Sequence, residues 1–370
     1  MSLRYKIYAA RYGAAGGHVP FLAPWWGVPP EDEASLHRGQ FDAWAEALPA
    51  AYTLVDHPEE ADVFMLSIPW KATRGDPAAR AFADREIRLA ENFHRQIVIF
   101  FDSDHDEPIV WPAHALVFRF SIYRDTRRPN EFSIPPFSQD FLAQRHGGML
   151  SPRAKEPEPS VSFCGYAPPL GCRWSLRAVR ESLRYAAYRL GALRHRRRLL
   201  AHAPRVQALR ALGRTRGIDP RFIIRDQFAF NRWGVLQPGG TAESAARQRG
   251  EFLANLDGSD YALCVRDLVN CSIRFSEALC LGRIPLFVNT QCVLPYDWLV
   301  DWKPACIWIE ETNLPRIGEL LRAAHARTAP AEFVARQRLG RELFARWLSP
   351  AGFFSELHRH FSIPAGTAQS

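Results

Sequence analysis

The chain has 370 residues, a length typical of about two domains. Hydrophobic residues make up 47% of it and charged residues 23%, and these proportions exclude a disordered chain, a collagen and a coiled coil. No apolar run approaches the roughly 18 residues that a membrane helix needs. The first residues, MSLRYK, lack the apolar core of a secretion signal, so we expect a cytoplasmic protein.

The first part of the chain alternates short apolar runs with helical patterns. Strands are predicted at residues 5–10, 63–68, 96–101 and 115–120, and helices at 40–48 and 78–94. Continuous apolar runs of this length are typical of parallel strands that are buried on both faces. An acidic loop, residues 102–107, follows the third predicted strand.

A stretch with glycine, charges and prolines, residues 147–159, is predicted to be a linker, after which the alternation restarts. Strands are predicted at residues 160–165, 222–225, 261–265, 284–288 and 305–309, and helices at 175–200, 247–256, 272–281, 314–324 and 331–348. The pattern indicates parallel βαβ units in two domains with a cleft between them. In such folds ligands bind beyond the carboxyl ends of the strands.

Charge is distributed unevenly. The net charge is +8, yet residues 177–232 contain fifteen arginines against two aspartates and one glutamate, which gives this block +12 and the rest of the chain −4. Such a block favours an anionic ligand or surface, although a solvated helix face explains it equally well. The seven cysteines form no CxxC pair, so we expect reduced, buried thiols and no zinc site.

The most informative segment covers residues 259–286, SDYALCVRDLVNCSIRFSEALCLGRIPL. It predicts a strand, a loop, a helix with Ser272 as its N-cap, a tight turn and a second strand. Arg274 falls in the first helical turn, where a cation opposes the helix dipole. A bound phosphate would offset this cost, because helix N-termini favour anions and arginine makes bidentate contacts to phosphate. Arg266 is expected to point into the same site, and Glu277 could accept hydrogen bonds from a ribose.

An alternative is open at this point. Arg274 and Glu277 are three residues apart, so they could form an ordinary ion pair on a solvated helix face.

The same segment resembles the core of the exostosin-type glycosyltransferases. Their pattern is an arginine, then Ser-x-Arg-x-x-Glu-Ala, then Gly-x-Ile-Pro-Val; here it is Arg266, SIRFSEA at 272–278 and GRIPL at 282–286. Weaker matches lie at HPEEADVF (57–64), SIPPFSQD (133–140), and FCG (163–165) followed by Arg173. The resemblance runs in order over roughly residues 50–345. Where the family has Pro-Arg-Gly, this chain has Asp267 in place of the glycine.

The resemblance implies an α/β fold of GT-B type, with two Rossmann-like βαβ domains facing across a cleft. Residues 1–150 would form the acceptor-side domain and residues 160–335 the nucleotide-sugar domain, with a C-terminal helix in 336–362 packing back toward the first. It also implies an inverting transfer of a sugar. The residues expected to bind the donor are Gly165, Arg173, Arg266, Ser272, Arg274 and Glu277.

An inverting transfer needs a general base near the acceptor hydroxyl. The acidic loop offers Asp102, Asp104 and His105, although an ordinary solvated loop would have the same composition. The Asp-Ser-Asp triplet could hold a metal, but such triplets are common by chance, and we expect neither a metal nor another cofactor.

The expected partners are a UDP- or GDP-sugar and a glycan or lipid-linked saccharide acceptor in polysaccharide biosynthesis. The basic block could add peripheral contact with an anionic membrane. One alternative is a non-catalytic protein that binds nucleic acid or another polyanion, although no nucleic-acid-binding motif is present. Another is a relative that keeps the fold without catalysis, for which Asp267 is the only indication.

Overall fold

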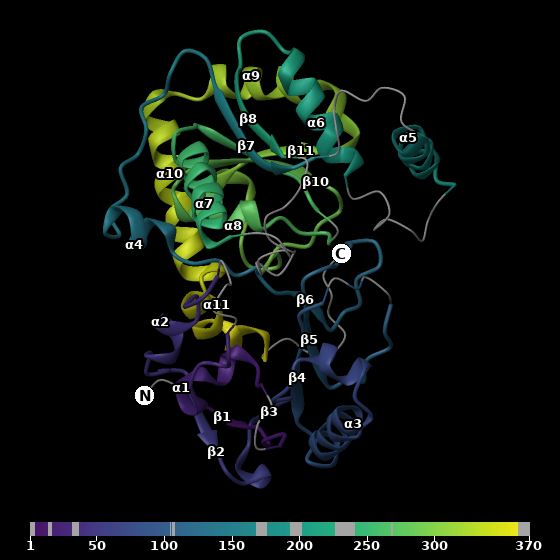
Figure 1. Ribbon diagram of the computed structural model, residues 1–370. Helices are drawn as coiled ribbons and strands as arrows, with labels where there is room; N and C mark the ends of the chain where they lie inside the picture. Colours follow the sequence, from purple (N-terminus) through teal and green to yellow (C-terminus); the bar gives the residue numbers. More distant parts are fainter. Residues whose placement is uncertain are drawn as a thin grey trace.

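A computed structural model describes residues 4–13, 17–31, 37–103, 105, 108–167, 176–192, 202–225, 241–267 and 269–361. These residues form two α/β halves, which Figure 1 shows one above the other. Each half is built on a sheet whose strands are all parallel. This confirms the predicted fold class of two Rossmann-like halves.

The first sheet has the strand order β2-β1-β3-β4-β5-β6. Its strands are β1 (Tyr5–Tyr8), β2 (Tyr52–Val55), β3 (Val63–Met65), β4 (Gln96–Phe101), β5 (Ala115–Arg119) and β6 (Glu131–Ser133). Its helices are α1 (Ala23–Trp26), α2 (Asp42–Ala45), α3 (Pro77–Asn92) and α4 (Phe141–His146). Alternate residues of β4 enter different cores, since Ile97 and Ile99 pack under α3 whereas Val98 and Phe100 face the opposite side.

The second sheet has the order β11-β10-β9-β7-β8. Its strands are β7 (Ser160–Tyr166), β8 (Asp219–Arg225), β9 (Tyr261–Cys264), β10 (Ile284–Asn289) and β11 (Ile307–Glu310). Its helices are α5 (Leu176–Arg189), α6 (Ala203–Arg214), α7 (Ala242–Asp257), α8 (Ile273–Cys280), α9 (Ile317–Arg327) and α10 (Pro330–Leu343). Of the predicted helix 175–200, the described residues contain α5, which ends at Arg189, and residues 193–200 lie outside the described residues.

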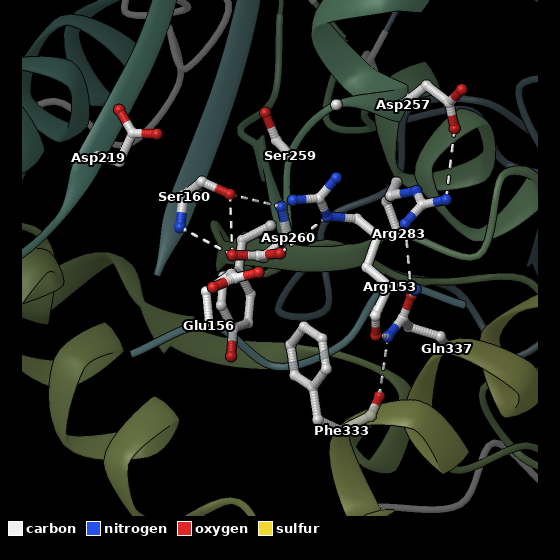
Figure 2. A network of polar contacts seen from close by, with 12 residues as sticks. Arg153, Glu156, Ser160, Asp219, Asp257, Ser259, Asp260, Arg283, Phe333 and Gln337 are labelled. Carbon is white, nitrogen blue, oxygen red and sulfur yellow. Dashed lines mark hydrogen bonds and ion pairs between the residues drawn. The ribbon is translucent and has the colours of Figure 1, made fainter. Parts of the chain in front are cut away.

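The chain passes between the halves twice. The first passage is the predicted linker, and its Arg153 binds Asp260 of the second half through Nε and Oδ1 at 2.9 Å (Figure 2). The second passage follows α10, through a π-helical turn (Phe344–Leu348) and α11 (Pro350–Ser355). There Phe354 accepts a hydrogen bond from Tyr52 of the first half at 2.9 Å, while Phe353 accepts one from Tyr296 of the second half at 2.8 Å.

The carboxyl ends of the two sheets face each other. Tyr123, which follows β5, forms an antiparallel bridge with Cys292, which follows β10. Asn270, which follows β9, donates from its backbone to Ser121 Oγ at 3.1 Å and from its side chain to the Ile122 carbonyl at 2.9 Å. Two parallel sheets opposed at their carboxyl ends form the GT-B arrangement, and ligands bind at such strand ends.

Candidate functional site

The N-terminus of α8 lies at this meeting of strand ends. Ser272 occupies the N-cap position with extended backbone angles (φ −134°, ψ 109°), which confirms where the sequence places the start of the helix. Its hydroxyl makes no capping hydrogen bond within the described part of the chain. Arg274 stands in the first turn, so this helix end carries a cation as well as the positive end of its dipole.

Arg274 reaches across to the end of β7. Its Nη2 donates to the Cys164 carbonyl at 2.7 Å, and its guanidinium carbon lies 4.6 Å from the centre of the Phe163 ring. Its Nε is buried without a hydrogen-bond partner among the described residues. Arg274 therefore binds a neutral carbonyl and an aromatic face, and its positive charge is not cancelled by a direct ion pair in that part of the molecule.

Gly165 is the residue that permits this approach. A Cβ atom at this position would lie 3.2 Å from Arg274 Nη2. That is closer than ordinary van der Waals contact, so a side chain here would push the guanidinium aside. The other donor residue predicted nearby, Arg173, lies outside the described residues.

Glu277 is buried on the same helix, with only 4% of its surface exposed. Burial raises its pKa, while the nearby Arg249 and Arg274 act in the opposite direction. No hydrogen bond or ion pair joins the Glu277 carboxylate to any described residue. The expected alternative, an Arg274–Glu277 ion pair on a solvated face, is therefore wrong, because the carboxylate is buried and the arginine binds elsewhere. Burial of a carboxylate without a hydrogen-bond partner costs free energy, and hydrogen bonds from a bound ligand would offset this cost.

Arg266 lies directly beyond β9 and connects the site to the first half. It is 4% exposed, and its Nη1 donates to the Tyr123 hydroxyl at 2.7 Å. Tyr123 follows the Ser121-Ile122 pair, but nothing in its local sequence identifies it as a partner of Arg266. Arg249 of α7 was also missed from the sequence, because only the folded chain brings it beside Glu277.

The acidic loop follows β4 at the carboxyl end of the first sheet. Asp102 Oδ2 forms an ion pair with Lys71 Nζ at 2.5 Å, and its Oδ1 is buried without a partner in the described ranges. Burial raises the pKa of Asp102, and Lys71 opposes that shift. The backbone of His105 accepts a hydrogen bond from Arg119 Nη2 at 3.0 Å. Asp104 lies outside the described residues, and no contact among the described residues joins this loop directly to Arg274.

Three further features bear on the predictions. No group of three or more His, Cys, Asp and Glu side chains within the described ranges could hold a metal ion. No helix in those ranges has the length and apolar character needed to cross a membrane.

A pocket of about 840 Å³ lies along α3, lined by Trp70, Arg74 and Trp111 among others, and contains none of the predicted site residues.

The basic block is partly used inside the fold. Arg205 is buried, Arg221 pairs with Asp219 at 2.6 Å, and Arg225 pairs with Glu251 at 2.6 Å. Residues 193–200, with the three consecutive arginines, lie outside the described residues. The described part of the block therefore serves internal contacts as well as the surface.

Comparison with known proteins gives one partial match in sequence. No family model matches the chain. Exostosin-1 of Drosophila melanogaster is 35% identical over 95 residues, which are 25% of this chain and 12% of that protein. The match thus covers about an eighth of the length of this relative.

Solved structures give only distant likenesses. A TarM mutant of S. aureus, in complex with fondaparinux, alpha-GlcNAc-glycerol and UDP, has a TM-score of 0.31 and 8% identity over 88% of this chain and 54% of its own. A glycosyltransferase from Rickettsia africae has a TM-score of 0.36 and 9% identity over 97% of this chain and 98% of its own. The fold assignment depends on the strand order and the contacts described above.

Proposed function

We propose that the chain is a glycosyltransferase of exostosin type, which transfers a sugar with inversion from a UDP- or GDP-sugar to a glycan or glycolipid acceptor. The observation that carries the proposal is Glu277, a buried carboxylate without a described partner, one helical turn from Arg274 at the meeting of two sheets. The partial match to an exostosin supports the same reaction class. Acidic and cationic groups in this order suit a ribose followed by a diphosphate.

The donor's diphosphate is assigned to Arg266, Arg274 and the N-terminus of α8 after Ser272. As the glycosidic bond to the diphosphate breaks, negative charge grows on the leaving oxygens. Guanidinium groups and helix N–H groups that are already in place stabilise this charge without rearranging. Gly165 keeps the end of β7 close to Arg274, and we assign Arg173 to the same subsite.

Glu277 is assigned to the ribose of the donor. Its carboxylate oxygens can accept hydrogen bonds from two neighbouring hydroxyl groups, and such charge-assisted bonds are stronger than neutral ones. Binding of the ribose would also remove the cost of leaving this carboxylate buried without a partner.

The general base is assigned to the acidic loop of the first half, with Asp102 as the leading residue and Asp104 and His105 as the others. The buried Oδ1 of Asp102 has no partner in the described ranges, and burial raises the pKa of this carboxyl, the direction that favours a general base. It would accept the proton of the acceptor hydroxyl as that oxygen attacks the anomeric carbon.

Thermal shift with a panel of nucleotide sugars tests the proposal. A ligand that binds only the folded state raises the melting temperature, so UDP- or GDP-sugars should do so whereas uridine and guanosine should do so weakly. Donors that bind are then incubated with oligosaccharide acceptors, and NMR of the product reports the anomeric configuration. Retention of configuration would overturn the inverting assignment, and absence of any nucleotide-sugar binding would overturn the function.

A further inference from the structure

Arg205 of α6 is a buried guanidinium next to the site that the sequence did not single out. It is 4% exposed, its Nη1 donates to the Tyr166 carbonyl at 2.9 Å, and its Nη2 donates to the Arg266 carbonyl at 3.3 Å. Its Nε is buried without a hydrogen-bond partner in the described part of the chain. Arg205 is thus fixed by backbone carbonyls beside one of the two arginines assigned to the diphosphate.

Arg205 and Arg274 occupy equivalent positions around the end of β7. Arg274 binds the carbonyl of Cys164 and Arg205 that of Tyr166, so their hydrogen bonds lie on either side of Gly165. Both guanidinium carbons also lie near the Phe163 ring, at 4.6 Å for Arg274 and 5.8 Å for Arg205. The end of one strand therefore gathers two cations, and Arg266 supplies a third.

Asp267 is the carboxylate that faces this cluster. Its Oδ2 lies 3.4 Å from Arg205 Nη2, and its Oδ1 lies 3.7 Å from His202 Nδ1. Both distances exceed the roughly 2.7–2.9 Å of a strong charge-assisted hydrogen bond. The Asp267 side chain is also 41% exposed. Toward Arg205 and His202, Asp267 is a counter-ion at longer range, and an anion arriving from solvent could compete with it for Arg205.

The surroundings of Arg205 disfavour its positive charge on balance. Burial lowers the pKa of Arg205, Asp267 raises it, and the neighbouring Arg274 and Arg266 lower it again. A diphosphate would bring more than one negative charge to these three guanidinium groups. It would therefore satisfy them better than a single, partly exposed carboxylate does.

We propose that Arg205 is a third guanidinium of the diphosphate subsite and that Asp267 is its resident counter-ion, which competes with the bound diphosphate. The inference rests on the proposed function, and it adds a role for Asp267 in binding and release of the diphosphate. Competition by Asp267 weakens the hold on the nucleoside diphosphate after transfer and so favours its release. In this proposal Asp267 adjusts the affinity for the diphosphate and does not indicate a loss of catalysis.

A double-mutant cycle tests this inference, with dissociation constants measured by calorimetry for UDP, GDP, pyrophosphate and uridine. Asp267→Asn should tighten binding of the diphosphate ligands by about three- to tenfold, the scale of one unit charge at a partly screened distance. Arg205→Met should weaken binding of the same ligands, and it should abolish the gain from Asp267→Asn. Neither change should alter the response to uridine, which lacks the diphosphate.

The possible outcomes separate the inference from the function. If the wild type binds UDP or GDP but Asp267→Asn does not tighten that binding, the inference fails and the function stands. Equal gains from Asp267→Asn with and without Arg205 would also overturn it. If Arg205→Met does not fold, Arg205→Lys takes its place, because it keeps the charge and should keep the gain. Absence of UDP, GDP and pyrophosphate binding in every variant overturns both.

Discussion

Charged side chains have different partners at the carboxyl ends of the two sheets. At the end of the first sheet, acidic and basic side chains form direct ion pairs. Lys71 pairs with Asp102 at 2.5 Å, and Arg119 pairs with Glu131 at 2.6 Å. At the end of the second sheet, Arg274 binds a backbone carbonyl instead. A guanidinium held by a neutral carbonyl is oriented yet keeps its charge for a ligand. The described pairs satisfy most of these charges on the first edge, whereas on the second edge Arg274 keeps its charge, which suits the anion subsite that we propose.

The largest expected effect concerns the base on the first edge. Asp102→Asn should lower kcat by about 10²- to 10⁴-fold, the usual contribution of general acid–base catalysis, and leave the dissociation constant of UDP unchanged. Steady-state kinetics and calorimetry measure the two quantities. Asp84→Asn, which breaks an exposed pair with Arg80, is the matched control. Unchanged turnover in Asp102→Asn would move the base to Asp104 or His105.

A second change breaks the pairing on the first edge. Arg119→Met leaves Glu131 buried without its guanidinium, and both partners are only 4% exposed. Removing one partner of a buried pair costs about 3–5 kcal/mol, so the free energy of unfolding should fall by that amount. Denaturant titration measures it. The double variant Arg119→Met with Glu131→Leu should recover part of the loss, and equal losses in the two would contradict the role of the pair.

Removing charge from the second edge should affect binding before stability. Arg274→Ala should weaken UDP binding by about ten- to hundredfold, because hydrogen bonds to charged groups contribute about 1.5–3 kcal/mol. Its melting temperature should change little, since the main chain of α8 is unaltered. Arg316→Ala, which removes an exposed arginine paired with Glu319, is the control. Near-normal binding in Arg274→Ala would remove the proposed diphosphate subsite.

The smallest effect is a pH dependence at Glu277. Because burial raises its pKa in the folded state, the unfolded chain loses this proton first, from about the ordinary value of 4.5. Folding stability therefore falls as the pH rises from there through the folded-state pKa. Glu277→Gln lacks this loss, so its stability relative to the wild type should increase with pH over that interval. If the free energies of unfolding of Glu277→Gln and the wild type instead change with pH in parallel, the Glu277 carboxylate does not destabilise the fold.

Sequence patterns predicted the central strands well and the edges poorly. The strand Gln96–Phe101 is apolar from Ile97 onward because it is buried on both faces, and it was predicted at its true bounds. Edge strands such as Tyr52–Val55 and Glu131–Ser133 were missed, since three or four partly polar residues give no periodic signal. The start of α8 was predictable because a cap and a helix are local. Its partners were not, because Cys164 is 110 residues away from Arg274.

The two chain passages between the halves constrain how the protein can move. A single connection would let one half rotate about it in any direction. Here the second passage, with Phe353 and Phe354 bonded to tyrosines of different halves, gives a second fixed point. These two fixed points and the direct contacts of Tyr123 and Asn270 together restrict how the halves can move relative to each other. The π-helical turn at Phe344–Leu348, with its looser winding, lies in the second passage, where a small rotation between the halves would bend the chain.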